Sequence, residues 1–237
     1  MHEQKDGNLY IGVAPVVGRV SGTMLIALAD LIEKYGAAGA RLTPYQKIVV
    51  LGVEPAKAEA LIAELDEIGL SARPSTWRRN TMACTGIEYC KLAIVDTKGR
   101  SHTLITDLEQ RFPVLDSDIT INVNGCPNAC ARTQVADIGS RDSSSPTRTA
   151  SRSRLPGPPR WRHRRPGELR PEAARHKVTS DGLGDYVAKL TENYLADRAE
   201  DETFTTWSCV LRRNSCDEHR SHERRAGIPR HPHRGAQ

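Results

Sequence analysis

The chain has 237 residues, 38% of them apolar, which is enough for one or two domains with a buried core. Its net charge of +5 would suit a nucleic-acid-binding protein, but the positive excess lies in residues 141–175 (+7) and 208–237 (+4), whereas residues 1–140 carry −2. No run of about 18 apolar residues predicts a membrane span, and the polar N-terminus has no signal-peptide pattern. We therefore expect a cytoplasmic protein. In that compartment its six cysteines are expected to be ligands or free thiols.

The first 72 residues predict a ferredoxin-like half-domain. Its expected elements follow the order β-α-β-β-α, at residues 8–17, 21–35, 40–43, 47–53 and 55–68. Ser21 suits the N-cap of the first helix, and glycines follow both helices. Helical spacing places one set of apolar residues on a single face of the first helix: Met24, Leu25, Leu28, Leu31 and Ile32. This order is that of a split βαβ unit.

The rest of the chain predicts a mixed α/β unit interrupted by a basic tract. A helix is expected from about residue 101 to 111, and a strand at 118–123 leads toward a pair of cysteines. Residues 176–207 predict a helix with one apolar face: Leu183, Tyr186, Val187, Leu190, Tyr194 and Leu195. Residues 141–175 hold ten Arg and six Pro, a composition that predicts disorder, as does the Arg- and His-rich tail at 208–237.

Two cysteine pairs carry the chemistry of this chain. Cys84 and Cys90 have five residues between them, Cys126 and Cys130 have three, and 35 residues separate the pairs. Four thiolates can hold a 4Fe-4S cluster. Structural zinc also uses four cysteines, although its usual spacing within a pair is shorter than the first gap here. Spacing alone therefore leaves a cluster, a zinc site and unrelated thiols open. Cys209 and Cys216 lie in aperiodic sequence and are treated as incidental.

The residues around the cysteines resemble one family. The stretches TMACTGIEYCKLAIVDTK and INVNGCPNACARTQVADIG are similar to the 4Fe-4S and siroheme region of the ferredoxin-dependent sulfite and nitrite reductases, and RLTPYQKIVVLGV resembles the half-domain of that family. The resemblance covers most of residues 8–140 and returns at 176–207. Members are built from two related halves, and this chain resembles the second half.

The resemblance implies a 4Fe-4S cluster and a siroheme as cofactors. Cys84, Cys90, Cys126 and Cys130 would each ligate one iron, and Cys130 would also bridge to the siroheme iron. Asn128 would shape a loop whose N–H groups point at sulfur, unless it sits in an ordinary Pro-Asn turn. Arg41 would reach a siroheme carboxylate, unless it is a solvated surface arginine. Catalytic residues that bind the substrate anion are expected in the missing N-terminal half, and none is identified here.

The implied reaction is the six-electron reduction of sulfite to sulfide with electrons from ferredoxin, and the alternative is the reduction of nitrite to ammonia. We expect a half-domain at 1–72, a 4Fe-4S and siroheme domain at 73–207, and a disordered tail at 208–237. Sulfite is favoured because CTGIEYC and GCPNACARTQVADIG are most similar to sulfite-type members. Neither a nucleic acid nor a membrane is expected as a partner.

Two tracts depart from the family pattern. Family-like sequence stops after Gly139, resumes near His176 and stops again after Trp207. One hypothesis is that residues 140–175 and 208–237 are frameshift products, which translation of the coding DNA in the other frames tests. The alternative is a genuine disordered basic linker and tail. Two other functions remain as alternatives: a non-catalytic four-cysteine metal-binding module, and a nucleic-acid binder. The second is disfavoured because Trp161 is the only aromatic residue of 141–175.

Overall fold

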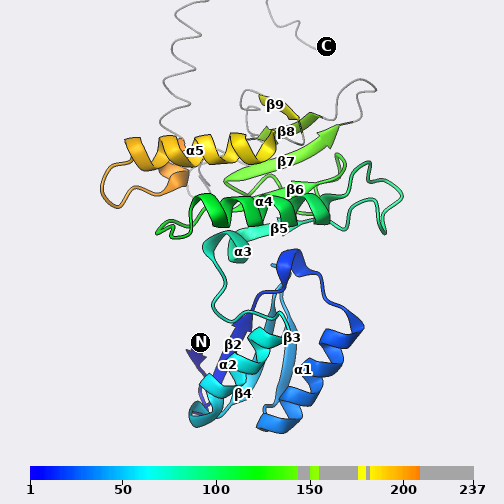
Figure 1. Ribbon diagram of the computed structural model, residues 1–237, viewed down its shortest axis with the longest axis vertical. Helices are drawn as coiled ribbons and strands as arrows, with labels where there is room; N and C mark the ends of the chain where they lie inside the picture. The colour runs from blue at the N-terminus through cyan, green and yellow to red at the C-terminus, as the bar shows by residue number, and fades with distance from the viewer. Residues whose placement is uncertain (144–149, 155–175, 180–181, 209–237) are drawn as a thin grey trace, which may run out of the picture.

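The computed structural model describes residues 1–143, 150–154, 176–179 and 182–208, which form two units, each built on a sheet (Figure 1). The elements in chain order are β1 (His2–Glu3), β2 (Leu9–Val13), η1 (Val16–Gly18), α1 (Gly22–Tyr35), β3 (Gly39–Leu42), β4 (Ile48–Val53), η2 (Pro55–Lys57), α2 (Ala58–Glu67), α3 (Thr76–Asn80), β5 (Thr81–Ala83), α4 (Thr97–Arg111), β6 (Ile121–Asn124), β7 (Ile138–Ser143), β8 (Ala150–Arg154), β9 (His176–Thr179) and α5 (Leu183–Asp197). None of the helices in these ranges is long and apolar enough to cross a membrane.

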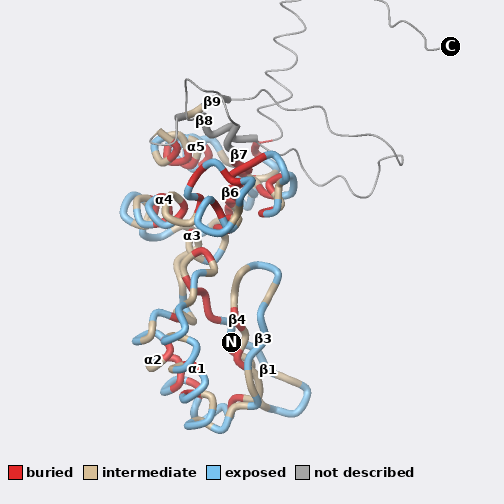
Figure 2. The backbone as a smooth tube through the Cα atoms, turned by 90° about the vertical axis from the view of Figure 1, so that its right-hand side faces the viewer, coloured by how far each residue is buried: buried red, intermediate tan, exposed pale blue. Residues whose placement is uncertain are grey.

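The first unit has the predicted β-α-β-β-α order, preceded by a short strand, β1, that was not predicted. Its four strands run in the order β1-β2-β4-β3 and are antiparallel. Helices α1 and α2 cover one face of this sheet (Figure 2). Ser21 caps α1 as predicted, because its hydroxyl accepts a hydrogen bond from the N–H of Met24 at 3.1 Å. Gly36 ends the helix in the left-handed conformation, with φ of 66°.

Apolar side chains from both layers form the core of the first unit. Val50, Val53, Leu61, Leu65 and Leu70 are fully buried in it. The predicted apolar face of α1 is wrong at Leu25, whose side chain is 45% exposed. Leu25 lies about 100° around the helix from Met24, at the edge of the stripe that faces the sheet.

The second unit is a five-stranded sheet in the order β5-β6-β7-β8-β9. Strands β5, β6 and β7 are parallel, and β7, β8 and β9 are antiparallel neighbours. Helices α4 and α5 pack against each other beside the sheet (Figure 1). The unit is therefore mixed α/β, as predicted.

Several predicted boundaries shift in the second unit. Helix α4 begins at Thr97 rather than near residue 101, because Asp96 caps it by accepting from Gly99 N–H at 2.9 Å. The segment 176–207 is not one helix: β9 pairs with β8, and only α5 and residues 204–208 are helical. Leu195, predicted on the apolar face, is 38% exposed because it sits in the last turn of α5.

Two strands occupy parts of the basic tract at 141–175. Strand β7 extends to Ser143, and β8 lies at Ala150–Arg154. Backbone pairing requires no apolar side chain, so an Arg- and Ser-rich segment can join a sheet next to its last apolar strand. The other residues of that tract, and all of 209–237, lie outside the described residues. The predictions of disorder and of a frameshift at those positions fall there.

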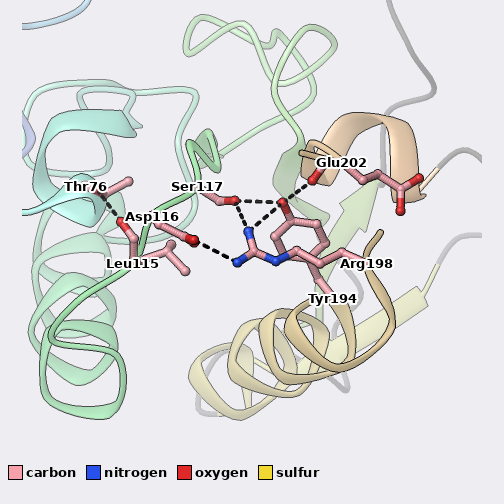
Figure 3. A network of polar contacts seen from close by, with 7 residues as sticks. All are labelled: Thr76, Leu115, Asp116, Ser117, Tyr194, Arg198 and Glu202. Carbon is pink, nitrogen blue, oxygen red and sulfur yellow. Dashed lines mark hydrogen bonds and ion pairs between the residues drawn. The ribbon is translucent and has the colours of Figure 1, made fainter. Parts of the chain in front are cut away.

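The end of α5 is fastened to the segment that leads into β6. Figure 3 shows the hydroxyl of Tyr194 between Ser117 and the carbonyl of Glu202, at 2.7 and 2.6 Å. The guanidinium of Arg198 donates to Asp116 and Ser117 at 2.8 and 3.0 Å. The ring of Tyr194 is fully buried against Phe204. These contacts fix the chain after α5 against the sheet.

Two hydrophobic clusters correspond to the two units. One contains residues from Leu9 to Ala72, and the other contains Trp77 and later residues. Val16 and Val17 of η1 are exceptions, because Val17 is buried in the second cluster and Val16 packs against it. We propose 1–72 and 73–207 as the two units on this basis, with η1 as a contact between them.

Candidate functional site

The two cysteine pairs leave the sheet at neighbouring positions. Ala83 at the end of β5 pairs with Val123 of β6, and the two strands are parallel. Cys84 follows β5 directly, and Cys126 follows β6 after Gly125. Because the carboxyl ends of neighbouring parallel strands meet at one edge of a sheet, both cysteine-bearing loops start from the same place.

Hydrogen bonds join the two loops beyond the ends of the strands. The N–H of Cys84 donates to the carbonyl of Val123 at 2.9 Å, and the N–H of Ile94 donates to the carbonyl of Gly125 at 3.1 Å. The N–H of Gly125 donates to the sulfur of Cys84 at 3.2 Å. One sulfur is therefore already held by a backbone donor of the other loop. Such N–H···S contacts tune the potential of metal–thiolate centres.

Thr97 at the start of α4 organises the loop between Cys84 and Cys90. Its hydroxyl donates to the carbonyl of Cys84 at 2.7 Å and lies 3.5 Å from the sulfur. Gly86 has φ of 77°, and a Cβ there would come within 2.7 Å of the Thr97 hydroxyl. A Cβ on Gly125 would lie 3.1 Å from the Thr97 methyl. Both glycines are therefore needed for the close approach of the loops.

A buried asparagine closes the loop between Cys126 and Cys130. Asn124 is 1% exposed, its carbonyl oxygen accepts from the N–H of Ala131 at 2.8 Å, and its amide donates to the carbonyl of Cys126 at 3.2 Å. Ala129 has φ of 57°, which folds the loop back on itself. One side chain thus ties together the two ends of the CPNAC segment.

The four cysteines are free thiols that differ in exposure. Cys126 is buried, Cys84 and Cys90 are half-buried, and Cys130 is exposed. Their residue type and their place on two joined loops fit a four-thiolate metal or cluster site. Within the described ranges, no three His, Cys, Asp or Glu side chains lie close enough together to hold a metal ion.

The other two predicted site residues lie farther out. Arg41 is an exposed residue of β3 and pairs across the sheet with Val49. Asn128 is exposed in the loop between Cys126 and Cys130. Among the described residues, no hydrogen bond or ion pair joins either side chain to a cysteine. Their roles stay predictions.

Two partly buried lysines add positive charge next to the first cysteine loop. The ammonium of Lys98 donates to the carbonyl of Val17 and to Gln46 Oε1. Burial lowers the pKa of Lys98, although the nearby Cys84 opposes this shift. Burial and the charge of Lys98 lower the pKa of Lys47 to about 8. This charge would favour an anionic group near Cys84.

Sequence reasoning missed the residues that hold these loops in place. Asn124 and Thr97 flank the motifs, and the adjacency of Asn124 to the second cysteine pair was an available signal. Two contacts cross the boundary between the units: Gln46 of the first unit donates to the carbonyl of Ala83, and Arg132 of the second unit donates to the carbonyl of Pro44. No sequence pattern marks them, because their partners lie 37 and 88 residues away.

Comparisons with known proteins match most of the chain. The family model described as the nitrite/sulfite reductase ferredoxin-like half domain matches residues 2–68. A protein of Mycolicibacterium paratuberculosis named sulfite reductase [ferredoxin] 1 is 46% identical over 86% of this chain and 38% of its own length. The solved structure of the Mycobacterium tuberculosis NirA protein matches with a TM-score of 0.77 and 43% identity, over 87% of this chain and 39% of that one. A chloroplastic ferredoxin–nitrite reductase of Zea mays is 40% identical over 59% of this chain and 25% of its own.

Proposed function

We propose that this chain belongs to an enzyme that reduces sulfite to sulfide with electrons from ferredoxin. The proposal rests on its similarity, over 86% of its length, to ferredoxin-dependent sulfite reductases. The chain spans only about 38% of the length of the curated sulfite reductases to which it is 45–46% identical. The activity, the substrate and the electron donor are therefore inferred for the longer protein. For this chain we propose the part that holds the cofactors.

The single observation that carries this proposal is the placement of the two cysteine pairs on loops that leave neighbouring parallel strands. Cys84, Cys90, Cys126 and Cys130 would hold a 4Fe-4S cluster. Cys130 would also share its sulfur with a siroheme. Its exposure supports that role, because a sulfur that serves two groups must be open on the side away from the cysteine loops.

The bound cofactor pair would supply one-electron transfer to the substrate anion. The chain's own residues would hold and tune it. The N–H of Gly125 would remain a donor to the Cys84 sulfur and stabilise negative charge there. Asn124 would keep Cys126 and Cys130 at a fixed separation. We further propose Asn128 as a loop-shaping residue and Arg41 as a partner of a siroheme carboxylate.

The cytoplasm is the compartment that we propose for this protein. Four free thiols on two loops persist most readily where the cell keeps cysteines reduced. A ferredoxin donor is consistent with the same compartment.

Nitrite is the second candidate substrate. Relatives named as nitrite reductases match at 36–40% identity over 59% of this chain, whereas those named as sulfite reductases match at 44–46% over 86%. The longer match favours sulfite. Groups that distinguish the two anions would lie in the portion of the relatives' length that this chain does not cover.

A non-catalytic four-cysteine metal-binding module is the candidate from another class. The three-residue spacing of the second cysteine pair favours it, because structural zinc sites commonly use such spacing. Such a protein would bind zinc through the same four thiols without any sulfide.

Metal analysis of the full chain separates these functions. The protein would be purified without oxygen, reconstituted with iron, sulfide and siroheme, and compared with a variant in which Cys84 and Cys126 are both Ser. We expect about five irons per chain, of which about four belong to the cluster and one to the siroheme, and about four acid-labile sulfides, with visible absorption that the double variant lacks. Zinc without sulfide would overturn the reductase assignment. The substrate would then be identified on the longer protein to which this chain is proposed to belong, by the release of sulfide or ammonium after addition of reduced ferredoxin and either anion.

A further inference from the structure

The turn between β3 and β4 has an unusual backbone at Gln46. The hydroxyl of Thr43 accepts from the N–H groups of Tyr45 and Lys47, which shapes the turn from within. Gln46 has φ of 59°, in the left-handed region that glycine enters most readily. Glycine would adopt this conformation at a lower cost in free energy. Gln46 therefore occupies a backbone conformation that is unfavourable for a residue with a side chain, which points to a role for its amide.

The amide of Gln46 holds the peptide groups that precede the first cysteine. Its Nε2 donates to the carbonyl of Ala83 at 2.6 Å, and its Oε1 accepts from the N–H of Ala83 at 3.3 Å. Both polar groups of Ala83 are thus satisfied by one side chain from the other unit. Because Cys84 is the next residue, the direction in which its side chain leaves β5 depends on this contact.

The half-buried side chain of Gln46 is held from two sides. A Cβ on Gly18 would lie 2.5 Å from the Cβ of Gln46, so η1 packs closely against it. Lys98 donates to its Oε1 from the other side, at 3.3 Å. These contacts therefore restrict the position of the Gln46 amide, although it lies at the end of a flexible side chain.

The same turn also contacts the chain after the last cysteine. Arg132 donates to the carbonyl of Pro44 at 2.8 Å, and its guanidinium lies 4.7 Å from the centre of the Tyr45 ring. The carbonyl of Arg132 accepts from Asn122 of β6 at 3.2 Å, so its backbone is tied to the sheet as well. One turn of the first unit thus touches the residue before Cys84 and the second residue after Cys130.

We propose that the β3–β4 turn is a positioning device for the cysteine ligands, in which Gln46 orients Cys84 and Arg132 holds the segment of Cys130. The half-domain then does more than cover the cofactors, since it sets the separation of two sulfurs that come from different loops. The inference rests on the proposed function only in taking these cysteines as ligands. Gln46 and Arg132 act through their neighbours and do not bind the cluster.

Replacing Gln46 gives opposite expectations for the turn and for the site. In Gln46→Gly the left-handed backbone is relieved, so the first unit should be no less stable. The contact to Ala83 is lost, so Cys84 should be less restrained. The rate at which a maleimide labels Cys84 in the metal-free chain should rise roughly 5- to 25-fold, about fivefold for each of the two hydrogen bonds to Ala83 that are lost. Bound iron and sulfide per chain after reconstitution should fall in the same variant.

Gln4→Ala is the matched control, because Gln4 Oε1 also accepts a backbone N–H, that of Gly52, but within the first unit. It should change neither labelling nor iron content. In Gln46→Glu the acceptor remains and the donor is lost, so its labelling rate should fall between those of the wild type and Gln46→Gly. Arg132→Ala should lower iron and sulfide without changing the labelling of Cys84.

Labelling of the metal-free chain keeps the two proposals apart. If the wild type takes up no iron and sulfide, the proposed function fails, while faster labelling of Cys84 in Gln46→Gly still supports the positioning role. If both Gln46 variants label at the wild-type rate and bind the wild-type amount of iron, the positioning role is overturned. Loss of the fold in Gln46→Gly, seen by circular dichroism, would also overturn it, because the turn would then be structural.

Discussion

The N–H of Gly125 donates to the sulfur of Cys84 across 3.2 Å, so a donor from the loop of the second cysteine pair meets a ligand of the first. Backbone hydrogen bonds between the two loops therefore hold the first cysteine pair beside the second.

Gly125→Ala should disturb this contact. The new Cβ would lie 3.1 Å from the Thr97 methyl and 3.2 Å from the Cβ of Ala93, so the loops must separate slightly. We expect a loss of about 1–3 kcal/mol in the free energy of unfolding and less iron and sulfide per chain. Gly12→Ala is the control, because nothing lies within 4 Å of a Cβ at that exposed strand position. Equal iron content in both variants would contradict the prediction.

Asn124→Ala should open the CPNAC loop. It leaves the buried N–H of Ala131 and the carbonyl of Cys126 without their partner. The expected cost is about 1–3 kcal/mol in urea unfolding, with reduced uptake of iron. Asn80→Ala removes an asparagine whose partner, Asp118, is exposed, and should cost much less. An Asn124→Ala chain that unfolds like the wild type would show that the loop needs no such closure.

Tyr194→Phe should loosen the attachment of the segment after α5. The variant keeps the buried ring but removes the hydroxyl that bonds Ser117 and Glu202. We expect a loss of about 1 kcal/mol in the free energy of unfolding. Tyr89→Phe, at a side chain that is 79% exposed, should leave the unfolding curve unchanged. Identical midpoints for the two variants would mean that the network in Figure 3 adds nothing to stability.

Lys47→Met should stabilise the protein near neutral pH. Burial and Lys98 lower the pKa of Lys47 from 10.5 to about 8, and its ammonium has no hydrogen-bond partner among the described residues. The folded chain therefore binds fewer protons than the unfolded chain between about pH 8 and 10.5, and its free energy of unfolding rises with pH across that window. Below that window the charge destabilises the fold, by on the order of 1–3 kcal/mol.

Urea unfolding at about pH 7 and about pH 10 measures this difference. The advantage of Lys47→Met should be largest at the lower pH and should shrink at the higher one. Lys57→Met replaces an exposed lysine that pairs with Glu54 and should give no stabilisation at either pH. An advantage for Lys47→Met that does not change with pH would mean that its cause is packing rather than charge.

Local signals in the sequence were sufficient for the first unit. Ser21 and Gly36 mark the ends of α1, and the strand predicted at 47–53 is β4, of which Ile48, Val50 and Val53 are buried and the other residues half-buried. Leu25 was misplaced because helical spacing does not say how wide the buried stripe is. The singling out of four cysteines as ligands stays a prediction that the joined loops support.

The second unit depends on pairings that no local pattern records. Arg152 of β8 lies opposite Arg141 of β7, a register that residue type alone does not predict, because like charges do not favour pairing. The break between β9 and α5 interrupts a segment with good helical spacing. Gln46 and Arg132 escaped notice for a similar reason, since a polar residue in a turn gives no sign of a partner far along the chain.

Val17 places one apolar side chain of the N-terminal segment inside the core of the other unit, beside α4 and β5. The backbone of Ala14 also pairs with Ser71, just before the connection between the units. A single cut between Ala72 and Pro74 would therefore not release two independent pieces. The fragments would stay associated through Val17 and the β3–β4 turn. Contacts between the two units, rather than the peptide connection at residues 72–74, would then hold them together.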